Sequence, residues 1–157
     1  APILAFTADE IWSAMPHRNS DNPENVMLNE INPPFTEYEL SEQQMAEFDE
    51  LAKIRDTVNV ALENARTDKM IGKSLEAKVT IHCPGSQVQL LEKYANILKT
   101  IFIVSQVSVV PSQELSVQVE PAEGLKCERC WSYGQDVGQD DEHPTLCARC
   151  AAVVKQL

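Results

Sequence analysis

The sequence predicts an α+β fold: the end of a helical bundle, then a small β-α-β-β unit, then a cysteine-rich C-terminal module. Three observations lead to this prediction. An apolar stripe with helical period runs through residues 41–70, a strictly alternating stretch follows over 74–83, and two C-x-x-C pairs lie near the C-terminus. We therefore expect three domains, over residues 1–72, 73–120 and 121–157.

The first helix is expected over residues 2–15, where apolar residues recur at helical spacing. Thr7 followed by Glu10 is a capping box at which the helix could restart, and Pro16 ends it. Residues 16–40 are rich in proline and predict an extended connector. We expect that connector to be anchored by Val26, Leu28 and Ile31.

The clearest helix is predicted over residues 41–70. Ser41 followed by Gln44 is a capping box, and Gly72 is a stop signal. Its apolar positions make one stripe: Met45, Phe48, Leu51, Ile54, Val58, Leu62 and Ala65.

The middle of the chain predicts a helix packed on three strands. Residues 74–83 alternate, with Leu75, Ala77, Val79, Ile81 and Cys83 facing the core. Pro84-Gly85 predicts a turn. A helix is expected over 86–100, with an apolar face of Val88, Leu91, Tyr94, Ala95 and Leu98, and strands over 101–110 and 114–120. The apolar run 101–104 is typical of a buried strand.

The chain carries a net charge of −11, unevenly distributed. Residues 1–50 hold eleven acids and one base, whereas residues 51–110 hold five acids and eight bases. The overall charge argues against a general nucleic-acid binder, but the basic middle suggests a local anionic contact. No stretch is long and apolar enough for a membrane helix. The chain starts without Met or a secretory signal, so we expect a fragment of a larger protein.

The four C-terminal cysteines predict one structural zinc ion. Cys127 and Cys130 form one C-x-x-C pair, and Cys147 and Cys150 form the other. Four thiolates close a tetrahedral shell and leave no position for water, so the site is expected to be structural. An iron centre or a dithiol redox pair is the alternative. We interpret His143 as a loop residue, and Cys83 as a small buried hydrophobe.

The residues beside these cysteines have two possible roles. Arg129 and Arg149 each precede the second cysteine of a pair, where a cation would stabilise the thiolates. Trp131 follows the first pair and could stack on a nucleotide base or pack over the zinc loops. A module with few apolar residues favours packing. No phosphate-binding loop and no nucleophile–His pair is present, so we expect no catalytic residue in this chain.

Three stretches together resemble the C-terminal region of bacterial isoleucyl-tRNA synthetases. They are PILAFTADEIW at 2–12, ARTDKMIGKSLEAKV at 65–79, and KCERCW at 126–131 with LCARC at 146–150. The first is similar to a late helix of the anticodon-binding domain, the second to the junction after it, and the third to the terminal zinc finger. The connector lacks the tryptophan expected before Pro33.

This resemblance implies a parent ligase that joins isoleucine to its tRNA with ATP in the cytoplasm, as a monomer. ATP would bind in a catalytic domain absent from this chain. The chain itself would be inactive and would contact the isoleucine-specific tRNA and the remainder of the parent. Candidate RNA-binding residues are Arg55, Arg66, Lys69, Lys73, Lys78, Arg129, Trp131 and Arg149.

Two further hypotheses come from other classes of protein. A zinc-stabilised protein-interaction module would suit the −11 charge, which disfavours a polyanionic partner. A finger like that of certain DNA glycosylases is the third, but the chain lacks the basic balance of a DNA-bound domain.

Overall fold

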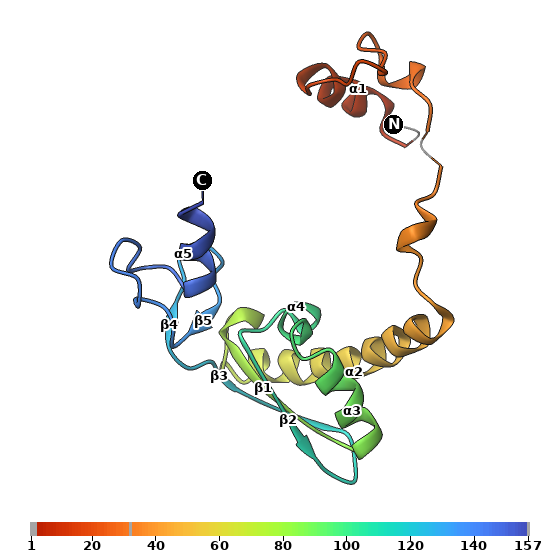
Figure 1. Ribbon diagram of the computed structural model, residues 1–157. Helices are drawn as coiled ribbons and strands as arrows, with labels where there is room; N and C mark the ends of the chain where they lie inside the picture. Colours follow the sequence, from red (N-terminus) through yellow and green to blue (C-terminus); the bar gives the residue numbers. More distant parts are fainter. Residues whose placement is uncertain (1–2, 32, 157) are drawn as a thin grey trace. The chain divides into compact units, whose positions relative to one another are not determined.

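The computed structural model describes residues 3–31 and 33–156, and it divides the chain into two compact units, Ala1–Leu40 and Ser41–Leu157. Figure 1 labels the α-helices and β-strands. The expected boundary at residue 72 therefore does not coincide with the structural division, which falls before the long helix. In the part of the chain that is described, no helix is both long enough and apolar enough to cross a bilayer.

The first unit contains α1 (Ala5–Ala14) and two short 3-10 helices, η1 (Val26–Leu28) and η2 (Thr36–Tyr38). The helix starts before Thr7 without a side-chain cap, so the expected restart at Thr7 is wrong; residue 2 lies outside the described residues. Of the three expected anchors only Val26 is half-buried, because Leu28 and Ile31 are exposed. Side-chain hydrogen bonds hold this segment instead: Asp9 Oδ1 accepts from the Val26 N–H at 3.1 Å, and Trp12 Nε1 donates to the Asn22 carbonyl at 3.0 Å.

The second unit begins with α2 (Glu42–Thr67), and the predicted capping box is present. Ser41 Oγ accepts from the Gln44 N–H at 3.2 Å, and Gln44 Oε1 accepts from the Ser41 N–H at 3.0 Å. The helix ends earlier than predicted, because Lys69 rather than Gly72 takes the left-handed conformation, with φ of 56°. The Met70 N–H then donates to the Ala65 carbonyl at 2.9 Å and closes the end of the helix.

A three-stranded sheet follows, in the order β2-β1-β3. Its strands are β1 (Ala77–Cys83), β2 (Gln106–Pro111) and β3 (Ser116–Pro121); β1 pairs with β2 in parallel and with β3 antiparallel. In β1 every second residue is buried, as predicted, although Leu75 lies before the strand in a 3-10 turn, η3 (Ser74–Glu76).

The helical crossover between β1 and β2 differs from the prediction of one helix over 86–100. It consists of α3 (Gly85–Lys93) and α4 (Leu98–Phe102), and Ala95 between them is exposed. The apolar run 101–104 is not a strand. It ends α4 and leaves Ile103 in the left-handed conformation, 53% exposed.

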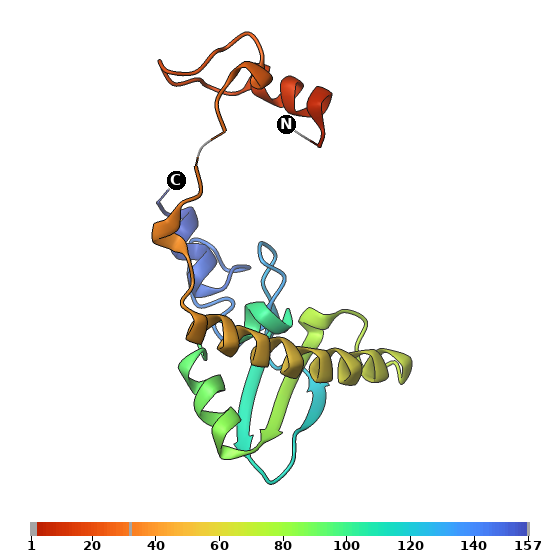
Figure 2. The ribbon, with the colours of Figure 1, turned by 90° about the vertical axis from the view of Figure 1, so that its right-hand side faces the viewer.

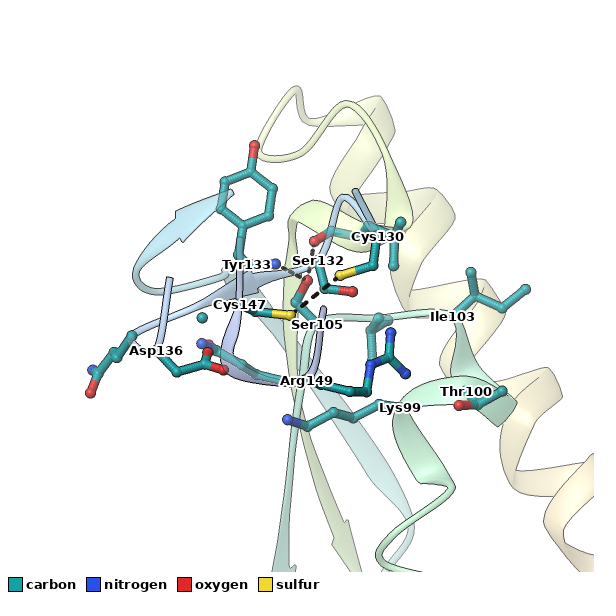
Figure 3. Close-up of a pocket in the computed structure, with 15 residues that line it drawn as sticks. Lys99, Thr100, Ile103, Ser105, Cys130, Ser132, Tyr133, Asp136, Cys147 and Arg149 are labelled. Atoms are coloured by element: carbon teal, nitrogen blue, oxygen red, sulfur yellow. Dashed lines mark hydrogen bonds between the residues drawn. The ribbon is translucent and has the colours of Figure 1, made fainter. Parts of the chain in front are cut away.

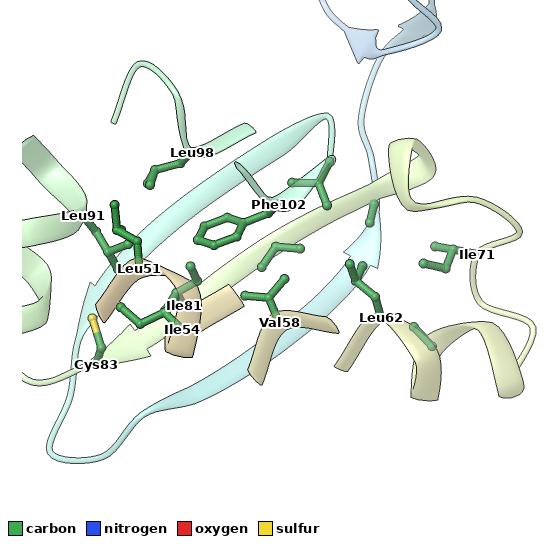
Figure 4. Close-up of a cluster of buried hydrophobic side chains, with 14 residues drawn as sticks. Leu51, Ile54, Val58, Leu62, Ile71, Ile81, Cys83, Leu91, Leu98 and Phe102 are labelled. Atoms are coloured by element: carbon green, nitrogen blue, oxygen red, sulfur yellow. The ribbon is translucent and has the colours of Figure 1, made fainter. Parts of the chain in front are cut away.

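One core joins α2, α3 and α4 to the inner face of the sheet (Figure 4). Figure 2 shows α2 crossing that sheet. The helix contributes Leu51, Ile54 and Val58, which meet Ile81 of β1 and Phe102 of α4 in the same cluster. The outer face of β1, including Lys78, remains half-exposed.

The C-terminal module contains β4 (Leu125–Lys126), β5 (Tyr133–Gly134) and α5 (Ala148–Val154). The two short strands pair antiparallel. A second, smaller cluster of buried residues forms around Cys127, Val137 and Cys150. The predicted four-cysteine module is thus present as a folded finger next to the sheet.

Candidate metal centre and nucleic-acid interface

The four cysteines of the finger converge on one point. The ligand atoms of Cys127, Cys130, Cys147 and Cys150 all lie within 4.8 Å of one another. The Sγ atoms of Cys130 and Cys147 are 3.8 Å apart, which equals the edge of a tetrahedron with Zn–S bonds of about 2.3 Å. These four sulfurs therefore fit a zinc ion with a closed shell.

The surroundings of the sulfurs also favour bound metal. Burial raises the pKa of the Cys147 thiol to about 12. Burial also opposes ionisation of Cys127, but backbone N–H donors from Cys130, Cys147 and Arg129 outweigh it and lower its pKa to about 6. Four thiolates this close together repel one another, and a divalent cation between them would stabilise all four.

Both arginines of the finger lie beside these sulfurs. Arg129 Nη1 is 3.7 Å from Cys150 Sγ. Hydrogen bonding to Cys130 and Cys150 raises the pKa of Arg149. These contacts satisfy the thiolate-stabilising role expected for the two arginines, and they direct part of each guanidinium toward sulfur rather than toward solvent.

Trp131 lies outside the finger's core. Its side chain is 56% exposed, so the interpretation that it packs over the zinc loops is wrong. The backbone explains this position: Trp131 adopts φ of 64°, and its N–H donates to the Cys127 carbonyl at 2.8 Å, closing the turn that carries the first cysteine pair.

Two lysines flank the exposed indole. Lys126 Nζ lies 5.6 Å from the ring centroid, and Lys73 Nζ lies 5.8 Å from it. Both distances suit a cation–π contact. We call Lys73, Lys126 and Trp131 the tryptophan–lysine face. Lys73 comes from the loop before β1, whereas the other two come from the finger, so two modules build this face.

A carboxylate borders the tryptophan–lysine face. Glu76 Oε2 accepts from the Gly72 N–H at 2.7 Å and from the Lys73 N–H at 3.3 Å. Those backbone donors, together with the charges of Lys73 and Lys126, hold the pKa of Glu76 below its ordinary value. The lysines therefore carry a partly compensated charge.

The remaining RNA candidates are spread over the second unit. Arg66 pairs with Glu63 and donates to Ser74 Oγ. Lys78 pairs with Glu123 at 2.7 Å on the outer face of the sheet. Lys69 is exposed, and Arg55 is exposed eleven residues before Arg66, about 16 Å away along the helix axis. Among the contacts described for these candidates, one joins two of them directly, the contact between Lys73 and Trp131.

A groove of about 870 Å³ lies between the finger and the sheet. Lys99 and Thr100 of α4 line it from one side, and Arg149 and Asp136 of the finger from the other (Figure 3). Sequence reasoning missed Lys99, and it also missed Lys126 in the tryptophan–lysine face. Lys126 carried a usable signal, because it directly precedes the first cysteine of the pair that orients Trp131.

Two family models match the chain, one over its N-terminal half and one over the finger. Residues 1–81 match the anticodon-binding domain of tRNA ligase, and residues 124–153 match the zinc finger found in FPG and IleRS. The finger match fits both a ligase and a DNA-repair finger, whereas the match over 1–81 fits only the first. The alternative of a DNA-glycosylase-like protein is therefore not favoured.

Individual relatives agree with this assignment. The chain is 45% identical to an isoleucine–tRNA ligase of Syntrophotalea carbinolica, covering 98% of this chain and 17% of that protein. It is 44% identical to the isoleucine–tRNA ligase of Dichelobacter nodosus, over 96% of this chain and 16% of that protein. It is 42% identical to the isoleucine–tRNA ligase of Geobacter sulfurreducens, over 99% of this chain and 18% of that protein. The chain thus spans less than a fifth of the length of these relatives.

Proposed function

Because the chain belongs to the anticodon-binding domain family of tRNA ligases, we propose that it is the tRNA-binding C-terminal portion of an isoleucine–tRNA ligase. The parent would join isoleucine to its cognate tRNA with ATP bound outside this chain. The isolated chain would bind tRNA and catalyse nothing. The observation that carries the RNA contact is the tryptophan–lysine face, an exposed indole with two ammonium groups close to its ring.

The chemistry of this face suits an unpaired nucleotide. An exposed indole offers a stacking surface to any base, and stacking contributes about 1–3 kcal/mol per base in other proteins. The ammonium groups of Lys73 and Lys126 would lie near the phosphates on either side of that base. Lys69, Arg66 and the remaining candidates would add phosphate contacts at longer range.

We also propose that Cys127, Cys130, Cys147 and Cys150 hold one structural zinc ion. Zinc would fix the turn that carries Trp131 and so prepare the face for RNA. The five cysteines are all free thiols in the described structure, which suits a reducing, cytoplasmic compartment. The monomeric state stays a prediction that sedimentation of the parent would test.

Binding of labelled tRNA to the zinc-loaded chain, followed by fluorescence anisotropy at low salt, tests the proposal. We expect Trp131→Ala to weaken binding by about 1–3 kcal/mol and Trp131→Phe to restore much of it. Replacing Lys73 and Lys126 by Ala should reduce the slope of log Kd against log salt by about one for each lost phosphate contact. Lys53→Ala is the matched control, because Lys53 is an exposed lysine that pairs with Glu50 on α2.

Competition with non-cognate tRNA tests the specificity for isoleucine tRNA. A clear preference for the cognate species would support the isoleucine assignment. If no tRNA bound at high micromolar protein, the proposal would fail and the protein-interaction module would be favoured.

A further inference from the structure

Ser105 is a buried hydroxyl that joins the finger to the sheet. Its side chain is 2% exposed, and it is the sole buried polar residue in the described part of the chain. Ser105 Oγ donates to the Leu75 carbonyl at 2.5 Å and accepts from the Tyr133 N–H at 2.7 Å (Figure 3). A hydroxyl has one donor and two acceptor positions, so this one group satisfies backbone atoms of both modules.

The next residue strengthens the same junction. Gln106 Nε2 donates to the Glu123 carbonyl at 2.9 Å, and Gln106 Oε1 accepts from the Glu123 N–H at 3.0 Å. The Gln106 side-chain amide therefore binds both the backbone N–H and the backbone carbonyl of Glu123, in the segment that leads into the finger. Ser105 and Gln106 together form a clamp at the start of β2, which we call the β2 clamp.

The β2 clamp lies between the two halves of the tryptophan–lysine face. Leu75, which accepts from Ser105, is two residues from Lys73. Tyr133, which donates to Ser105, is two residues from Trp131. The distance between the Lys73 ammonium and the indole therefore depends on how the finger is held against the sheet, and the Ser105 hydroxyl is hydrogen-bonded to both segments.

We infer that Ser105 is a positioning residue for RNA binding: its hydroxyl sets the finger so that Lys73 and Trp131 form one site. This inference rests on the proposed function of that face. Zinc folds the finger, and the β2 clamp places the folded finger; the two roles are separable because the cysteines do not touch Ser105 in the described hydrogen bonds.

Removal of the Ser105 hydroxyl should have an effect on tRNA binding that would not follow if Ser105 served only the stability of the fold. Ser105→Ala leaves the Tyr133 N–H and the Leu75 carbonyl without their partner, so the finger is held less firmly against the sheet while zinc keeps it folded. We expect the affinity for tRNA to fall about fivefold or more. Lys73→Ala, which weakens binding in the wild-type chain, should then have little further effect, because the two residues act as a unit.

The experiment is a double-mutant cycle on the full chain with bound zinc. Wild type, Ser105→Ala, Lys73→Ala and the double variant are compared by zinc content, circular dichroism and Kd for labelled tRNA. Ser108→Ala is the control, since Ser108 is an exposed serine in the same strand. Gln106→Ala replaces Ser105→Ala in a second cycle, and that cycle decides the question if Ser105→Ala fails to fold.

A measurement without RNA separates this inference from the proposed function. In a Trp12→Phe background Trp131 is the only fluorophore of its kind, because the chain has two tryptophans. We expect Lys73→Ala to shift the emission of Trp131 in the background that retains Ser105. In the Ser105→Ala background, the same substitution should leave the emission unchanged. If Lys73→Ala acts equally in both backgrounds, in affinity and in emission, the inference is wrong. If Lys73→Ala shifts the emission only where Ser105 is present and changes the affinity in neither background, the proposed RNA site fails while the role of Ser105 in positioning the finger stands.

Discussion

Gly124 shows how a single residue controls the entry into the finger. It adopts φ of +93°, and a Cβ atom there would lie 2.3 Å from the Gly134 carbonyl oxygen. The segment that leads into the finger can therefore approach β5 only because Gly124 has no side chain. Contact between main-chain atoms at this point complements the β2 clamp, which binds the neighbouring Glu123.

Replacement of Gly124 by Ala is expected to destabilise the second unit. The unfavourable backbone conformation alone costs about 1–3 kcal/mol, and the clash with Gly134 adds to it. Urea unfolding of the zinc-loaded chain measures the change. Gly85→Ala is the matched control: no atom lies within 4 Å of its Cβ position, and Gly85 starts α3, so we expect a stabilisation of about 0.4–1 kcal/mol. Equal effects of the two substitutions would contradict this account.

Glu47 links α2 to α3 through its carboxylate. Oε2 accepts from Lys93 Nζ at 2.6 Å and from Tyr94 OH at 2.5 Å. Hydrogen bonds from Lys93 and then from Tyr94 hold the pKa of Glu47 below its ordinary value of 4.5. Because the folded pKa is lowered, the stabilisation by this carboxylate is complete above pH 4.5 and is lost as the pH falls through the folded pKa.

Glu47→Gln should therefore change the pH dependence of stability. We expect the variant to be less stable than wild type at pH 7 and the difference to shrink below pH 4.5. Unfolding free energies at a series of pH values measure it, with Glu92→Gln, an exposed acid on α3, as the control. Parallel profiles for wild type and Glu47→Gln would show that the carboxylate contributes no pH-dependent stability.

The long helix α2 was predictable because its apolar stripe has a clear period and its start has a capping box. Leu51, Ile54, Val58, Leu62 and Ala65 are all buried, as the stripe indicates. The same reasoning failed for residues 101–104. Four consecutive apolar residues carry no period, and the helix end there depends on Ile103 in a left-handed conformation that sequence patterns assign to glycine.

Core residues of α2 should dominate the stability of the second unit. Ile54 is fully buried against the sheet, and Ile54→Ala is expected to cost about 2–5 kcal/mol, since the cavity can collapse only in part. Val60→Ala on the same helix is the control: Val60 is 63% exposed, and its loss should change the unfolding free energy by less than about 0.5 kcal/mol. A small effect at Ile54 would mean that α2 does not belong to this core.

The division into units depends on contacts that a single sequence does not reveal. The stripe on α2 requires a partner, and both the preceding helix and the following sheet could supply it. The core assigns that partner as the sheet, so α2 belongs to the same compact unit as the sheet, Ser41–Leu157. The metal site was more accessible to prediction, because C-x-x-C spacing specifies its ligands locally, whereas Ser105 becomes relevant only once the finger meets the sheet.

Zinc removal tests how these parts depend on one another. The finger has a small cluster of three buried residues, and two of them are cysteines. The sheet, by contrast, has a large apolar core of its own. Zinc contributes about 10–16 kcal/mol to the folding of comparable fingers, so a strong chelator should unfold residues 121–157 and leave α2 and the sheet folded.

Hydrogen exchange provides the readout at both places. We expect amides of the finger, such as those of Cys127 and Trp131, to lose protection after chelation, while those of Val79 and Ile81 in the central strand keep it. Added Zn²⁺ should restore protection and the emission of Trp131, and added Mg²⁺ should not, because thiolates select the softer ion. Native Trp131 emission in metal-free protein would contradict the structural role of zinc. Loss of protection in β1 would instead mean that the β2 clamp makes the sheet depend on the finger.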